Sequence, residues 1–346
     1  MVRFAVCVLI LSTIFGIASS ALAGSLIPPA GYVCIDTPIE IPAYGWFGGF
    51  DFLPNGNFVI SDGYSLREIT RQGTTVRTLY VFPDPDPSTP NVVESVFGSF
   101  VKYDATSDKI YFGESSLGTI RSIAATGGSV ELLATLAFNY DLDLQNGVPY
   151  VVASNKIYRL SGGIADHIAT VIGPSGPLVF DGNGNLIYGT GDYDWSTPND
   201  QGIYRWSATQ VASAGGGIIL GLNDAEVLAS GVNGPGGFAL NGLGELLYTD
   251  SVGWPASVRI MRNGTIETFA ETYVPGQFPW TTTLRYNSAT GDIAAAVSWA
   301  VYENGQWLTT SVISTLTPVP EPSSLFALCS LIGLAASSKL IRHRSK

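Results

Sequence analysis

The chain has 346 residues, and its 28 acidic side chains outnumber its 17 Lys and Arg side chains, which gives a formal net charge of −11. This balance argues against nucleic acid as a partner, because no basic face is available to neutralise phosphates. Charged residues make up only 13% of the chain, whereas 40 glycines and 11% aromatic residues favour an all-β protein with many tight turns over a helical one.

The chain begins with the pattern of a secretory leader. Residues 1–23 carry Arg3 in a short basic region, continue through an apolar core, and end on Ala21, Leu22 and Ala23. A basic region, an apolar region and a small-residue cleavage site in this order are typical of a signal peptide. We expect cleavage after Ala23, with an uncleaved membrane anchor as the alternative, and therefore expect the body of the protein to be exported.

The body, residues 24–318, contains six similar units. Each unit is an alternating apolar strand, a short turn rich in Gly, Asn and Asp, and a second apolar strand. In each first strand, two apolar residues stand two places apart and so face the same side. The second residues of these pairs are Phe52, Tyr103, Leu144, Phe180, Leu240 and Tyr286, about 47 residues apart on average.

A third and a fourth strand are predicted after the hairpin in most units. The third strands begin at Ser65, Thr119, Lys156, Gly202 and Ser257. Four strands per unit of this length are typical of a propeller blade, so we predict a six-bladed β-propeller, with five or seven blades as alternatives. The sixth unit is the weakest, since its second strand is alanine-rich. Either residues 32–36 or residues 311–316 could close the ring.

The hairpins carry a family resemblance. Residues 180–190, FDGNGNLIYGT, resemble the blade motif of NHL-repeat and gluconolactonase-like propellers. That resemblance implies one divalent metal held by Glu, Asn or Asp side chains on the innermost strands. The matching positions here are mostly Gly, Phe and Leu, at residues 48–50, 98–100, 176–178 and 236–238. The pattern predicts close packing around the axis, so the metal site is not carried over.

One loop, residues 189–202, combines acidic and aromatic side chains. Its carboxylates could surround a hard cation such as Ca²⁺, which prefers oxygen ligands, and its aromatic rings could stack on a sugar. Solvated loop acids explain the same pattern. The candidate metal ligands are Asp192, Asp194 and Asp200, and the candidate ligand-binding residues are Tyr193 and Trp195.

Support for catalysis is sparse. The only histidines are His167, in a predicted outer strand, and His343, in the C-terminal tail. No nucleophile elbow, zinc motif or phosphate loop is present, although a pair of catalytic carboxylates would leave no characteristic spacing. Cys34 is the only cysteine of the body, and we expect it to be inert, with a reactive or intermolecularly bridged thiol as the alternative. We therefore predict no catalytic residue.

The C-terminal residues 319–346 have three parts: a Pro-Glu-Pro box, an apolar run and a basic tail. Their order resembles the PEP-CTERM sorting signal. The resemblance implies recognition by an exosortase, transient anchoring in the inner membrane by a transmembrane helix, and release to the cell surface or matrix of a Gram-negative bacterium that makes exopolysaccharide and biofilm. The residues that carry it are Pro320, Glu321, Pro322, Arg342 and Arg344.

These patterns lead to one expected function and two alternatives. We expect an exported, non-catalytic binding or scaffold propeller of the cell envelope or matrix, with a polysaccharide or an envelope protein as partner. A metal-dependent lactonase or hydrolase on the same fold is the first alternative. A structural component of a biofilm that needs no specific ligand is the second.

Overall fold

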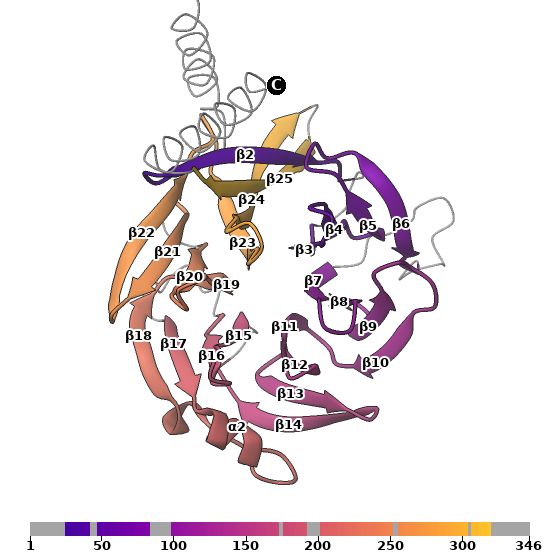
Figure 1. Ribbon diagram of the computed structural model, residues 1–346, viewed down its shortest axis with the longest axis vertical. Helices are drawn as coiled ribbons and strands as arrows, with labels where there is room; N and C mark the ends of the chain where they lie inside the picture. Colours follow the sequence, from indigo (N-terminus) through magenta and orange to yellow (C-terminus); the bar gives the residue numbers. More distant parts are fainter. Residues whose placement is uncertain are drawn as a thin grey trace, which may run out of the picture.

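A computed structural model describes residues 25–41, 47–83, 98–172, 176–191, 201–251, 255–303 and 306–319. These residues form six antiparallel sheets arranged around a central axis (Figure 1). The innermost strand of each sheet lies beside the axis, and the outermost strand lies at the rim. The protein is therefore an all-β, six-bladed propeller, as predicted, and the alternatives of five or seven blades are wrong.

Blades one to five each run outward from the axis in chain order. Blade one comprises β3 (Gly49–Phe52), β4 (Phe58–Ser61), β5 (Ser65–Ile69) and β6 (Thr75–Val81), and blade two comprises β7 (Gly98–Asp104), β8 (Lys109–Glu114), β9 (Thr119–Ala124) and β10 (Glu131–Thr135). Blade three comprises β11 (Asn139–Gln145), β12 (Val148–Ala153), β13 (Lys156–Ser161) and β14 (Ile164–Thr170). Blade four comprises β15 (Leu178–Phe180), β16 (Leu186–Gly189), β17 (Gln201–Trp206) and β18 (Glu226–Val232). Blade five comprises β19 (Pro235–Leu240), β20 (Leu246–Asp250), β21 (Ser257–Arg262) and β22 (Thr265–Thr272).

The predicted hairpins are the two inner strands of each blade. In blade four, the turn of residues 181–185 is built by Asp181, whose Oδ1 accepts the backbone N–H groups of Asn183 and Asn185, both at 2.9 Å. Gly184 in this turn has φ of +81°, a conformation that glycine adopts without the penalty of a side chain. A hairpin turn therefore accounts for the acidic, glycine-rich sequence at this position.

The ring is closed by strands from opposite ends of the chain. Blade six consists of β23 (Trp280–Tyr286), β24 (Ile293–Glu303), β25 (Gln306–Pro318) and β2 (Tyr32–Ile39). β2 pairs with β25 in antiparallel register, from Tyr32 opposite Pro318 to Ile39 opposite Ser311. The two segments that the sequence offered as alternatives are therefore paired with each other.

The alanine-rich strand of the sixth unit is one of the longest in the protein, so the view of this unit as weak was wrong. β24 has 11 residues, and Ala294 and Ala296 are completely buried in a cluster with Phe50 and Phe58 of blade one. The small alanine side chains leave room for these aromatic rings between blades six and one. The alanine residues of this strand therefore indicate close packing between two blades, and not a weak tendency to form a strand.

The N-terminal segment is held by Asp36 of β2. Its Oδ2 accepts the backbone N–H and the hydroxyl of Ser25, both at 2.8 Å, and its Oδ1 accepts the hydroxyl of Ser314 at 2.7 Å. The short β1 (Leu26–Ile27) then adds a fifth strand to blade five, beside β22. Cys34 is buried in the same region, and burial raises the pKa of its thiol to about 12, which agrees with the expectation of an inert cysteine.

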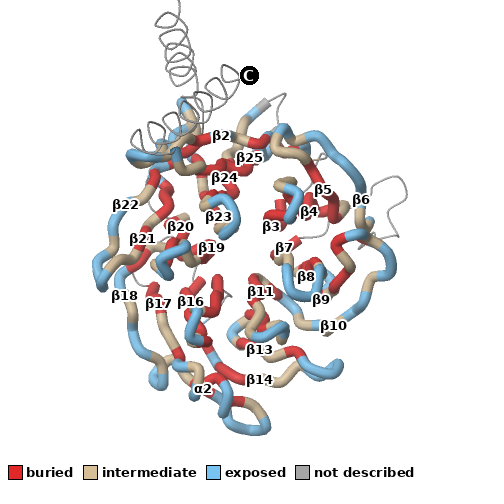
Figure 2. Tube along the Cα trace, viewed as in Figure 1, coloured by how far each residue is buried: buried red, intermediate tan, exposed pale blue. Residues whose placement is uncertain are grey.

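The core lies between the blades, and the exposed residues lie mainly on the turns and outer strands (Figure 2).

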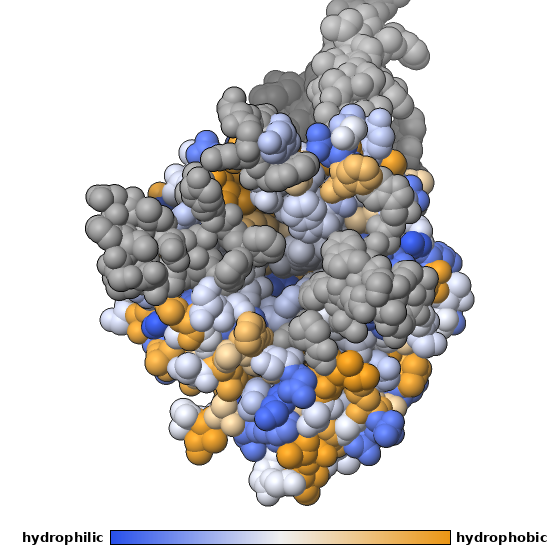
Figure 3. All heavy atoms as spheres, turned by 180° about the vertical axis from the view of Figure 1, so that it is seen from behind, coloured by the Kyte–Doolittle hydropathy of each residue, from blue (hydrophilic) through white to orange (hydrophobic). Residues whose placement is uncertain are grey.

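Blade four carries an insertion with the short helix α2 (Ala208–Ser213) and the 3₁₀ turn η1 (Leu222–Asp224). Leu220 of this insertion bonds to β14 of blade three, donating to Ile168 O at 2.9 Å. Seen from behind, hydrophilic and hydrophobic residues are interspersed over the described surface (Figure 3).

Both predicted targeting segments lie outside the described residues. These are the signal peptide, residues 1–23, and nearly all of the sorting signal, residues 319–346. Within the described ranges, no helix has the length and apolar character needed to cross a bilayer. The domain boundaries at both ends of the propeller therefore stay predictions.

Candidate ligand-binding site in the channel

The innermost strand of each blade presents its side chains alternately to its two neighbouring blades. In blade one, Phe50 and Phe52 pack on blade six, whereas Asp51 between them faces blade two. The other innermost strands repeat this arrangement. The residues between the paired apolar positions are Asp51, Lys102, Asp143, Val179, Ala239 and Arg285, and all six line one cavity beside the axis. Four of the six are charged.

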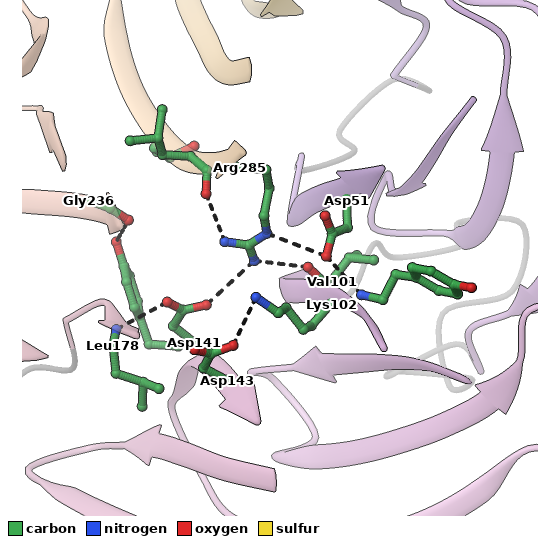
Figure 4. Close-up of polar contacts among 12 residues, drawn as sticks. Asp51, Val101, Lys102, Asp141, Asp143, Leu178, Gly236 and Arg285 are labelled. Atoms are coloured by element: carbon green, nitrogen blue, oxygen red, sulfur yellow. Dashed lines mark hydrogen bonds and ion pairs between the residues drawn. The ribbon is translucent and has the colours of Figure 1, made fainter. Parts of the chain in front are cut away.

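These charged residues pair with each other across the blades (Figure 4). Lys102 Nζ lies 2.8 Å from Asp143 Oδ1. Arg285 lies between two carboxylates, with Nη2 at 3.6 Å from Asp141 Oδ1 and Nε at 3.8 Å from Asp51 Oδ2. We refer to Asp51, Lys102, Asp141, Asp143 and Arg285 as the channel cluster.

The channel cluster also provides hydrogen-bond partners for backbone groups beside the axis. An innermost strand has no neighbouring strand on its axial edge, so its N–H and C=O groups there need side-chain partners. Asp51 Oδ2 accepts the N–H of Tyr103 and Asp143 Oδ2 accepts that of Phe180, both at 2.8 Å. Arg285 Nη2 donates to Val101 O at 2.9 Å. The charged side chains therefore join the inner strands of adjacent blades.

Burial and neighbouring charges act in opposite directions on the pKa values of Asp141 and Lys102. Burial raises the pKa of Asp141, and the guanidinium of Arg285 only partly opposes this rise. Burial also works against the charged form of Lys102, but the carboxylates of Asp143 and Asp51 outweigh it, so the pKa of Lys102 is raised. Lys102 is therefore a fixed cation, whereas burial favours the neutral form of Asp141.

Two cavities lie along the axis, on either side of Arg285, which lines both. The larger, of about 780 Å³, opens where the innermost strands begin, and the smaller, of about 320 Å³, lies where they end. The wall of the larger cavity is mostly apolar. Its aromatic members are Phe47, Phe138, Tyr140 and Trp280, and its charged members are Asp141 and Arg285.

Glycine at the start of the innermost strands allows the blades to approach one another. A Cβ atom on Gly48 would overlap the backbone of Gly98, and one on Gly237 would lie 2.6 Å from the backbone nitrogen of Leu284. The predicted close packing around the axis is therefore confirmed. No three His, Cys, Asp or Glu side chains are grouped to hold a metal in the part of the chain that the structure describes.

Replacing Gly48 with alanine is expected to lower the free energy of unfolding by about 1–3 kcal/mol, because blades one and two must move apart to admit the new methyl group. Gly182 provides the matched control, since a Cβ atom there meets nothing within 4 Å. Urea unfolding of the two variants measures the difference. Equal stability of Gly48→Ala and Gly182→Ala would contradict the close packing.

The raised pKa of Asp141 predicts a pH dependence of stability. An acid whose pKa is higher in the folded than in the unfolded protein stabilises the fold when protonated, and this contribution is lost as the pH rises. The free energy of unfolding, relative to that of Asp141→Asn, is therefore expected to fall from the ordinary pKa of 3.8 up through the raised folded value, by about 1.4 kcal/mol for each pH unit between the two pKa values. Urea unfolding from pH 3.5 to pH 8 tests this, and a difference that stays flat would contradict it.

The predicted site residues belong to parts of the chain that the structure does not describe. Asp192, Tyr193, Asp194, Trp195 and Asp200 lie outside the described residues, so the calcium and sugar-stacking interpretations stay predictions. The same holds for Ala23, Pro320, Glu321, Pro322, Arg342 and Arg344. His167 lies on the outer strand β14, where its Nε2 is 2.9 Å from Ala169 O, in agreement with a surface role.

The fold is shared with proteins of known structure, although no protein-family model and no curated protein matches the sequence. A gluconolactonase of Xanthomonas campestris is 16% identical, with 86% of this chain and 98% of that chain covered and a TM-score of 0.55. Regucalcin, a calcium-binding protein of Agrobacterium tumefaciens, is 16% identical, with 85% and 96% covered and a TM-score of 0.53. A luciferin-regenerating enzyme is 11% identical, with 83% and 95% covered and a TM-score of 0.54.

These similarities define the class of the fold. The protein is a six-bladed β-propeller of gluconolactonase-like architecture, as the hairpin motif of residues 180–190 predicted. At these identities the likeness concerns the fold alone, and the activity must be argued from the channel.

Proposed function

We propose that this protein is an exported propeller that binds a small ligand in the larger channel cavity without chemically altering it. The observation that carries the proposal is that several of the polar side chains around this mostly apolar cavity are bonded to the protein itself. Apolar cavities with a few placed polar groups are the usual form of small-molecule sites. Catalysis, by contrast, needs a nucleophile or a base directed at the substrate.

The bonds that occupy these side chains are specific. Ser99 Oγ bonds to Asn139 Oδ1, and Asn139 Nδ2 donates to Glu114 O and Leu136 O, both at 3.1 Å. Tyr140 donates its hydroxyl to Gly236 O at 2.9 Å. These side chains hold blades two, three and five together, and the cavity is thereby formed before any ligand arrives.

A blocking variant tests the binding proposal. Ser115 lines the larger cavity, so Ser115→Trp is expected to fill it, whereas Thr209→Trp on the exposed side of α2 leaves it open. A thermal-shift screen of small molecules against the purified protein is expected to yield compounds that stabilise the wild type and Thr209→Trp but not Ser115→Trp. If no compound shows this difference, the proposal fails.

Export and sorting form a further part of the proposal and depend on the terminal sequences. The leader is removed after Ala23, and an exosortase recognises Pro320-Glu321-Pro322 and releases the tail, which leaves the propeller at the cell surface or in an exopolysaccharide matrix. A polysaccharide or an envelope protein is the partner there. Mass spectrometry of the mature protein tests the processing, and an intact C-terminus at Lys346 would contradict it.

Hydrolysis of a lactone is the second candidate function, and Asp141 favours it. This carboxyl group lines the larger cavity beside Arg285, and its raised pKa suits a general acid or base. The fold is also similar to that of a gluconolactonase. Sugar-lactone hydrolysis that is present in the wild type and lost in Asp141→Asn, at equal stability, would replace the binding proposal with this one.

Calcium binding by Asp192, Asp194 and Asp200 belongs to the proposal as well. Its support is the acidic sequence of the loop and the similarity in fold to a calcium-binding protein. Addition of Ca²⁺ is expected to raise the melting temperature of the wild type but not that of Asp192→Asn/Asp194→Asn. An unchanged melting temperature in the wild type would refute the site.

A further inference from the structure

Phe138, at the rim of the larger cavity, has a backbone conformation that is unusual for its type. Its φ is +53°, in the left-handed region that bulky residues rarely adopt. The other non-glycine residues with positive φ in the described ranges are Asp108, Asn146, Ser154 and Asn263, all small polar residues that are common in turns. Such strain in a bulky residue is often associated with a functional position.

The conformation of Phe138 does not serve the packing of the core. Its side chain is 68% exposed, although it lines the cavity. The backbone around it is fixed, since Phe138 O accepts the N–H of Ser154 at 3.0 Å and the next residue, Asn139, is buried. A rigid backbone therefore holds an exposed aromatic ring at the opening of an apolar cavity.

A second aromatic ring stands across the opening. Phe138 immediately precedes β11 of blade three, whereas Trp280 begins β23 of blade six, and these two blades are opposite each other in the ring (Figure 1). Both side chains line the same cavity. The cavity is therefore lined by aromatic side chains from two opposite blades.

The base of the cavity disfavours a charged or hydroxyl-rich molecule. Arg285 is already paired with Asp141 and with Val101 O, and Asn139 and Tyr140 are bonded to backbone carbonyls. The hydroxyls of Ser115, Thr282 and Thr283 also line the cavity. Beyond what these few groups can replace, the hydroxyls or charges of a ligand buried here would lose their bonds to water without gaining equivalent ones. An uncharged, largely apolar ring meets no such cost and can pack against Phe138 and Trp280.

We infer that the larger cavity selects a compact, uncharged, largely apolar ring compound, and that Phe138 and Trp280 bind its two sides. This inference rests on the proposed binding function and narrows its ligand class. It places charged sugar acids and free sugars outside the ligand class of this cavity.

Binding of matched probes tests the inference. We expect benzyl alcohol and indole to bind the purified protein in saturation-transfer NMR, and benzoate and glucose to bind at least tenfold more weakly. Phe138→Ala and Trp280→Ala should each weaken indole binding at least fivefold. Phe278→Ala is the matched control, because Phe278 is 74% exposed near Trp280 but does not line the cavity.

A glycine variant separates a binding role of Phe138 from a structural one. Phe138→Gly relieves the left-handed backbone, so its melting temperature should equal or exceed that of the wild type while indole binding is lost. A lower melting temperature with unchanged binding would overturn the inference.

The remaining outcomes separate the inference from the proposed function. If glucose or benzoate binds as tightly as indole and Ser115→Trp abolishes this binding, the ligand class is wrong while the binding function stands. If no compound of any class binds, both are wrong.

Discussion

Replacing Arg285 with methionine is expected to lower the free energy of unfolding by about 3–5 kcal/mol at neutral pH. Arg285 is 6% exposed and lies between Asp51 and Asp141, which would lose the cation they share and keep only the nearby Lys102. The variant also loses the bond to Val101 O that joins blade six to blade two. Urea unfolding at pH 7 measures the loss.

The control is Arg205→Met, which removes an arginine from an exposed pair. Arg205 contacts Glu226, which is 57% exposed in its side chain, so its loss should cost less than about 1 kcal/mol. Lowering the pH should restore part of the stability of Arg285→Met, since protonation neutralises the carboxylates. Equal stability of the two variants would show that the channel cluster does not join the blades.

Ending the chain after Thr310 is expected to abolish folding, whereas ending it after Val319 should leave the melting temperature nearly unchanged. The shorter chain lacks residues 311–318 of β25, which include every position that pairs with β2. The longer chain keeps this segment and the bond from Val319 N to Gly31 O at 2.8 Å. Circular dichroism melts of the two truncated proteins measure the difference.

A cooperative melt in the chain that ends at Thr310 would contradict this view of the ring. Limited proteolysis adds a control that does not depend on thermal behaviour. In that chain, β2 has lost its partner strand and should be cleaved, whereas in the chain that ends at Val319 it should be protected.

The sequence predicted the blades because each blade is built from neighbours in the chain. The alternation of apolar residues and the glycine-rich turns repeat locally, so six hairpins could be recognised one by one. The closure could not be recognised in this way. Asp36 and Ser314 bond to each other across 278 positions of sequence, and no local pattern records which of two end segments is the partner of the other.

The channel cluster was missed for a different physical reason. Its members are scattered from Asp51 to Arg285 over four innermost strands, with one or two in each strand, whereas the loop of residues 189–202 attracted attention by its local composition. A signal was nevertheless present, because the residue between each pair of apolar positions must face the next blade. Comparing Asp51, Lys102, Asp143 and Arg285 at this one position would have indicated opposite charges on adjacent blades.

The pairing of β2 with β25 has a consequence for the time course of folding. During synthesis, β2 leaves the ribosome before any blade has formed. β25, the strand with which it pairs, is the last of the strands to leave. Blades one to five can form as their residues emerge, while β2 must wait with its apolar residues uncovered. Contacts between such distant parts of a chain form slowly and leave intermediates prone to aggregation. The docking of β2 onto β25 should therefore be the final, rate-limiting step of folding. A chaperone that shields β2 until then should accelerate refolding of the protein.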